Sequence, residues 1–147
     1  MTGLACPSVP VSWGELLDKI TILAIKRDRI ADAAAKANVL REHDLLARIG
    51  AEALHHEGVA ALVGALGRVN AELWDIEDAI RRKEARGQFD PEFIRLARSV
   101  YLRNDERARI KREINQRLGS ELVEEKSYAS VVSVGPWQEK PIDTVVR

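Results

Sequence analysis

Apolar residues recur along most of the chain at the three- and four-residue spacing that is typical of an amphipathic α-helix. The clearest run alternates spacings of four and three residues, through Leu62, Leu66, Val69, Leu73, Ile76 and Ile80. Such a strict seam predicts a long helix that ends near Gly87. The basic residues just before that glycine suit the negative end of the helix dipole.

The residues that follow predict a second long helix. Asp90 is placed to cap it, Pro91 is suited to its first position, and Gly119 is placed to stop it after about Leu118. Both helices are then roughly 28 residues, or about 42 Å, long. Because only a short loop joins them, they are expected to fold back as an antiparallel hairpin.

A shorter helix is predicted before this hairpin, from about Trp13 to Ala31. Ser12 can cap it, and Glu15 stands three residues later, as in a capping box. Apolar residues fall on two sides of this helix, which indicates that it packs between partners. Those partners are other helices of the bundle or a second copy of the chain. The larger stripe comprises Trp13, Leu16, Leu17, Ile20, Leu23 and Ala24, and the smaller one Ile22 and Ile25.

The remaining segments complete the fold prediction. A further helix is expected over roughly Lys36 to His55, with Leu40, Leu45, Leu46 and Ile49 as its apolar face. Residues 1–11 hold two prolines and no periodicity, which predicts an extended lead-in. The valine- and serine-rich residues 120–147 predict an extended or weakly β C-terminal arm. Together these elements predict one all-α domain over residues 1–147, a bundle of about four helices built on the long hairpin.

Composition narrows the function classes. The 147 residues carry 23 basic and 23 acidic side chains, so no global charge attracts nucleic acid or anionic lipid. No apolar run approaches the roughly 18 residues that a membrane span needs. The single cysteine, Cys6, excludes an internal disulfide and a thiolate zinc site. We therefore expect a cytoplasmic protein that does not enter membranes, and nucleic-acid binding is disfavoured.

Polar residues occupy an unexpected face of the last long helix. At about 100° per residue, Asn104, Arg107, Lys111 and Asn115 project with the apolar residues that flank them. Burial of an unpaired Arg or Lys is prohibitive, so each cation requires an acid or an anionic ligand. The hairpin register excludes Glu77 and Glu84 as partners of Lys111. The remaining candidates are Glu15 and Asp18 in the first helix, beside Lys19, and Glu124 and Glu125 in the arm.

Two hypotheses account for this face. In the first, the polar groups form internal ion pairs and amide hydrogen bonds that fix the helix register. In the second, they line a pocket for an anionic small molecule, with the negative charge supplied by the ligand. The first is favoured, because structural ion-pair networks are common.

Other chemistry is weakly indicated. Glu52 and His55 form one Glu-x-x-His step, but di-iron bundles use two copies, so no metal site and no cofactor is predicted. No nucleophile elbow, P-loop or dinucleotide fingerprint occurs.

Four stretches resemble a bacterial family of small helical proteins whose function is unknown. They are VPVSWGELLDKITILAIKRDRI, LWDIEDAIRRKE, FIRLARSVYLRNDERARIKREIN and GSELVEEKSY, and the resemblance runs from Val9 to about Tyr128. The resemblance implies a stand-alone helical protein and no particular activity. A fainter likeness, of architecture alone, is to helical chorismate mutases, which place Arg and Lys from long helices around a dicarboxylate.

The sequence therefore favours a non-enzymatic interaction or accessory protein, with a homodimer and a protein partner as the expected assemblies. The alternative is a small-molecule binder or enzyme that takes an anionic ligand. Its candidate ligand-binding residues are Asn104, Arg107, Lys111, Asn115, Glu15, Asp18 and Lys19.

Overall fold

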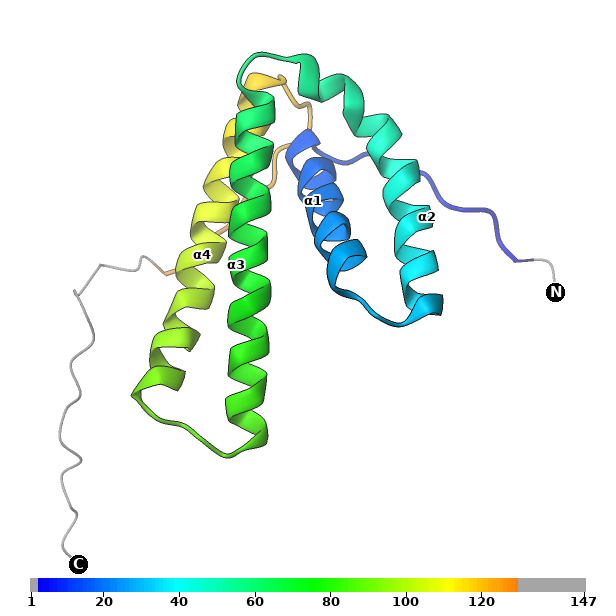
Figure 1. Cartoon of the computed structure of the whole chain (residues 1–147). Coiled ribbons are helices and arrows are strands. Elements are labelled where there is room, and N and C mark those ends of the chain that lie inside the picture. The colour runs from blue at the N-terminus through cyan, green and yellow to red at the C-terminus, as the bar shows by residue number, and fades with distance from the viewer. Residues whose placement is uncertain (1–2, 130–147) are drawn as a thin grey trace, which may run out of the picture.

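The computed structural model describes residues 3–129, and the helices within this range confirm the all-α prediction (Figure 1). No strand occurs in the described part of the chain. The helices pack against one another as a bundle. In chain order they are α1 Trp13–Arg29, α2 Ala33–Gly50, the short 3₁₀ helix η1 Ala51–His55, α3 Val59–Ala85 and α4 Pro91–Arg117.

The long antiparallel hairpin is formed by α3 and α4, each 27 residues long. Glycine ends both helices, as predicted. Gly87 follows α3 and Gly119 follows α4, and they adopt positive φ angles of 63° and 58°. At the start of α4, the Asp90 side chain accepts a hydrogen bond from the backbone N–H of Phe93 at 2.9 Å. The local signals in the sequence therefore set the hairpin's length and turn.

Helix α1 lies between other helices of the same chain. It packs against α3 and α4 and also against α2, and it lies between α2 and the hairpin (Figure 1), so the second apolar stripe needs no second copy of the chain. The core lies where α1, η1, α3 and α4 meet, and it is made by Leu17, Ala53, Val59, Leu66, Val69, Ile110 and Ile114. A homodimer stays a prediction, and the two-sided α1 no longer argues for it.

The predicted apolar face of α2 is largely wrong. Leu40, Leu45 and Ile49 are exposed, whereas Val39 and Gly50 are buried. The reason is close packing: a Cβ atom built on Gly50 would lie 2.6 Å from Cδ1 of Ile20. Small residues bring α2 near α1, and the larger leucines turn outward.

Several predicted boundaries shift by a few residues. Helix α1 ends at Arg29 instead of Ala31, and α2 begins at Ala33, where Asp32 caps it by accepting from the N–H of Ala35 at 2.8 Å. The last residues of the helix that was predicted over Lys36 to His55 form the 3₁₀ helix η1 instead. Residues 120–129, named the arm here, have no helix or strand. The weak β-structure predicted beyond them lies outside the described residues.

The α3–α4 hairpin extends beyond the helices that pack against it. Figure 1 shows its loop end lying well beyond the connection between α1 and α2. No residue from 71 to 109 is fully buried, although this range includes Leu73, Ile76 and Ile80 of the apolar seam. The distal part of the hairpin is thus a two-helix ribbon with a half-exposed apolar face.

Gly14 is a point of close approach between α1 and α4. A Cβ atom at this position would lie 2.6 Å from the backbone oxygen of Lys111, which cannot move without displacing the helix. We expect Gly14→Ala to lower the free energy of unfolding by about 1–3 kcal/mol, the usual cost of overpacking. Gly67→Ala is the matched control. Its Cβ would meet nothing within 4 Å, so it should raise stability by about 0.5–1 kcal/mol through helix propensity. Urea unfolding of both variants checks the pair, and equal effects would contradict the close contact.

Candidate functional site

The N-terminus of α1 is closed by side chains from the end of α4. The Oδ1 atom of Asn115 accepts a hydrogen bond from the N–H of Gly14 at 2.6 Å, and Oγ of Ser120 accepts from the N–H of Trp13 at 3.2 Å. Ser12 caps the same turn by accepting from the N–H of Glu15 at 3.2 Å. Three N–H groups that a helix end leaves without partners are therefore satisfied, and Asn115 acts here as a structural cap.

Asp18 lies at the meeting point of α1, α3 and α4. Its side chain is 2% exposed, and both of its oxygens bind the guanidinium of Arg107, from Nε at 2.9 Å and Nη2 at 2.5 Å. Asn70 of α3 donates from Nδ2 to Oδ1 of the same carboxylate at 2.9 Å. The hydrogen bond to Asp18 also raises the pKa of Arg107 above its ordinary value. A fork of this geometry is among the stronger ion pairs in proteins.

Asn70 also binds the turn of α1 that contains Asp18. Its Nδ2 donates to Oγ1 of Thr21 at 2.9 Å, and that hydroxyl donates to the backbone oxygen of Asp18 at 2.7 Å. This residue was missed from the sequence because it stands beside the strict apolar seam of α3. Its position four residues after Leu66 and three before Leu73 was the available signal.

Lys111 connects α1, near Asp18, to the arm. Its side chain is 8% exposed, and its ammonium donates to Glu15 of α1 and Glu124 of the arm, both at 2.7 Å, with Asp18 at 3.8 Å. Burial lowers the pKa of Lys111, but the hydrogen bonds to Glu124 and Glu15 outweigh it, so the pKa lies above its ordinary value. We name Glu15, Asp18, Arg107, Lys111 and Glu124 the polar cluster.

Two of the predicted site residues lie at or beyond the margin of this cluster. Asn104 is half-buried, and its side-chain oxygen accepts a long hydrogen bond of 3.4 Å from Arg107. Lys19 points elsewhere and forms a surface ion pair of 2.8 Å with Glu42 of α2. The structure thus brings together Glu15, Asp18, Arg107 and Lys111, places Asn115 beside them as a cap, and separates Lys19.

The polar cluster is satisfied by the chain's own groups. Within residues 3–129, every buried side-chain nitrogen and oxygen has a hydrogen-bond partner. Both cations contact carboxylates, and three carboxylates surround them. The site can therefore fix the relative positions of α1, α3, α4 and the arm, while an anion would have to displace Glu15 or Glu124 to reach Lys111.

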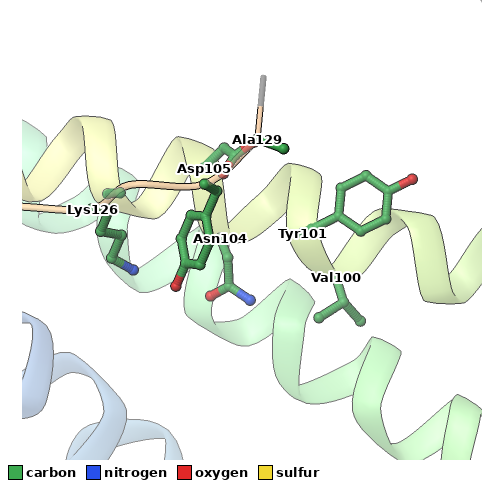
Figure 2. Close-up of a pocket in the computed structure, with 8 residues that line it drawn as sticks. Val100, Tyr101, Asn104, Asp105, Lys126 and Ala129 are labelled. Atoms are coloured by element: carbon green, nitrogen blue, oxygen red, sulfur yellow. The ribbon is translucent and has the colours of Figure 1, made fainter. Parts of the chain in front are cut away.

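A groove of about 750 Å³ opens next to the cluster, between α4 and the arm. Figure 2 shows Val100, Tyr101, Asn104 and Asp105 on the helix, with Lys126 and Ala129 on the arm that passes over it. Tyr128 of the arm also lines it. Apart from Asn104, the sequence did not indicate these residues, because the arm carries no periodic pattern that fixes where it lies.

The described residues form neither a metal site nor a membrane-spanning helix. Among residues 3–129, no three His, Cys, Asp or Glu side chains are grouped so that they could hold a metal ion. His55 and His56 are exposed. None of the described helices combines the length and the apolar character that crossing a bilayer demands.

Comparison with known proteins identifies the family. The model of a family described as a family of unknown function (DUF6165) matches residues 8–140, most of the chain. The chain belongs to this family. The match confirms the resemblance carried by the four sequence stretches and extends it past Tyr128, while a bacterial origin stays a prediction. No curated protein and no solved structure matches the chain.

Asp18 offers the sharpest test of the polar cluster. Asp18→Ala would leave Arg107 without its carboxylate and Asn70 without one of its acceptors, in a buried place. We expect the free energy of unfolding to fall by about 3–5 kcal/mol, as when one partner of a buried ion pair is removed. Asp75→Ala is the matched control, since Asp75 pairs with Arg29 at an exposed site. It should cost less than about 1 kcal/mol. Chemical denaturation of both variants measures the difference, and comparable losses would argue against a buried pair.

The docking of the arm should depend on pH. The hydrogen bond from Lys111 lowers the pKa of Glu124 below its ordinary value of 4.5. A carboxylate with a lowered pKa in the folded state contributes stability above its unfolded pKa and loses it as pH falls through the folded pKa. The stability difference between wild type and Glu124→Gln should therefore be constant from neutral pH to about pH 5 and shrink below pH 4.5.

Urea unfolding of both proteins between pH 3 and pH 7 measures this difference, and Glu121→Gln in the same arm controls for the loss of one negative charge. A difference that is unchanged at the lowest pH would contradict the pairing of Glu124 with Lys111.

Proposed function

We propose that this chain is a non-enzymatic interaction or accessory protein of the cytoplasm, in which the polar cluster sets the register of the helices and seats the arm. The observation that carries the proposal is the pairing of Lys111 and Arg107 with Glu15, Glu124 and Asp18. These cations already have counter-charges, so they are poorly suited to hold an anionic substrate. Electrostatic catalysis by such a bundle needs cations directed at the ligand.

Exposed apolar side chains support an interaction role. Outward-facing residues of α2 and of the arm include Leu45 and Ile49, which are 56% and 53% exposed, and Leu122 and Val123. Leu45 and Ile49 stand one turn apart on the same helix, so their exposed surfaces are adjacent, and adjacent apolar surface of this kind marks contact sites. A rigid helical platform with such surfaces is suited to hold a protein partner, and the ion pairs of the polar cluster supply the rigidity.

A small-molecule binder is the second candidate, and the groove beside α4 is the observation that favours it. Its volume of about 750 Å³ lies in the range of ligand pockets. In this case the ligand would contact Asn104, Asp105 and Lys126 rather than Lys111. The anionic ligand expected from the sequence is disfavoured there, because Asp105 opposes it on the same wall.

A thermal-shift screen separates the two candidates. We expect no rise in the melting temperature of the full chain with phosphorylated compounds, nucleotides or dicarboxylates at millimolar concentration. A reproducible rise that disappears in Asn104→Ala would instead establish ligand binding at the groove. Lys19→Ala is the control variant, because Lys19 lies on the α1–α2 surface. A rise lost equally in both variants would indicate a general effect on stability, without a site at the groove.

A further inference from the structure

The distal half of the hairpin leaves an apolar face uncovered. Helix positions seven residues apart share a face, so the row of α4 that carries Lys111 and Asn104 toward α1 continues to Ala97. The row of Arg107 continues to Val100, which also lines the groove beside the arm, and then to Phe93. On α3 the seam continues through Leu73 and Ile80 to the loop, and all these distal residues are half-buried. Where α1 has ended, its place on the hairpin is therefore taken by no helix of the described chain.

One rim of this face carries opposite charges in a symmetric order. On α3, the row that begins with Asn70 continues to Glu77, and Arg81 stands one turn later on the same side. Arg81 is 80% exposed and Glu77 50%, with 3.4 Å between their charged atoms. About a two-fold axis that crosses α3 between them, Glu77 of one copy would lie opposite Arg81 of the other, and the reverse.

The presence of α1 selects the orientation of a second copy. If two hairpins met face to face with their loops at the same end, each would occupy the space of the other's α1. If they meet with the loops at opposite ends, only the distal halves overlap, and α3 then runs antiparallel to its symmetry mate. This is the arrangement that also places Glu77 against Arg81. Steric exclusion and charge order therefore agree on one geometry.

We propose that two copies of this chain form an isologous homodimer through the distal faces of their α3–α4 hairpins, with Glu77 and Arg81 paired reciprocally across the two-fold axis. This deepens the proposed interaction function by naming one partner, the chain itself. The loop end of each hairpin, where Phe89 is 59% exposed and packs edge-to-face on Phe93, then reaches toward the α1–α2 connection of the other copy.

The size of the face indicates a reversible dimer. From Ile76 to Ala85, α3 extends about 15 Å, and two helices side by side are about 20 Å wide. The resulting footprint, on the order of 300 Å² per copy, lies below the roughly 800 Å² per partner of standard stable interfaces. The expected behaviour is a monomer–dimer equilibrium at micromolar concentrations, with no obligate assembly.

Sedimentation velocity of the full chain from about 1 to 300 μM tests the dimer, since this range brackets the affinity expected for a small interface. Arg81→Glu should weaken association at least tenfold, because it places acidic residues on both sides of the axis. The double variant Glu77→Arg with Arg81→Glu restores opposite charges and should recover the dimer. Arg109→Glu is the matched control, because Arg109 is also an exposed member of an i,i+4 pair, far from the loop.

Several outcomes would overturn the proposal. These are a monomer at every concentration, a dimer that Arg81→Glu and Arg109→Glu weaken equally, and a double variant that stays monomeric while circular dichroism shows it folded. A chain ending at residue 129 provides a further test. If the full chain is monomeric and the shortened chain dimerises, residues 130–147 cover the face instead. None of these results changes the ligand screen, so the proposed function and the dimer can fail independently.

Discussion

The structure depends on one buried carboxylate. Asp18 is almost inaccessible to solvent, and the free energy of burying its charge is offset only when Arg107 and Asn70 reach it together. Apolar helix faces tolerate some sliding, because one leucine contact replaces another at similar energy. The fork of Arg107 on Asp18 has a single satisfactory arrangement, so it selects one register among the many that the hydrophobic core would accept.

Lys111 fixes the position of the arm in the same way. Since its ammonium is shared by Glu15 and Glu124, the arm is attached at the place where α1 meets α4. The polar face that looked like a candidate anion site in the sequence is thereby closed by the chain's own acids. What remains accessible is the surface: outward leucines of α2, the groove beside α4, and the unsupported end of the hairpin. The proposed interaction function uses these accessible surfaces and leaves the polar cluster in a structural role.

Much of the fold was predictable because its signals are local. Asp90, Pro91 and the two terminal glycines define the hairpin without reference to any other element, and the helical period alone turned Lys111 inward. The assignment of acids to cations was not predictable, because Glu15 and Asp18 lie one turn apart and either could face either cation. The outward turn of Leu45 was hidden for a related reason: it follows from how closely α2 approaches α1, which depends on Gly50 meeting Ile20.

The closure of α1 has a consequence for the order of folding. Its first turn is completed by Asn115 and Ser120, which are separated from it by 101 and 107 positions along the chain. During synthesis α1 leaves the ribosome before α4, so it cannot acquire these caps until α4 and the start of the arm have emerged. Contacts between such distant positions slow folding. Until α4 and the arm dock, the N–H groups of Trp13 and Gly14 therefore lack these acceptors, and the first turn of α1 is the part of that helix that is completed last.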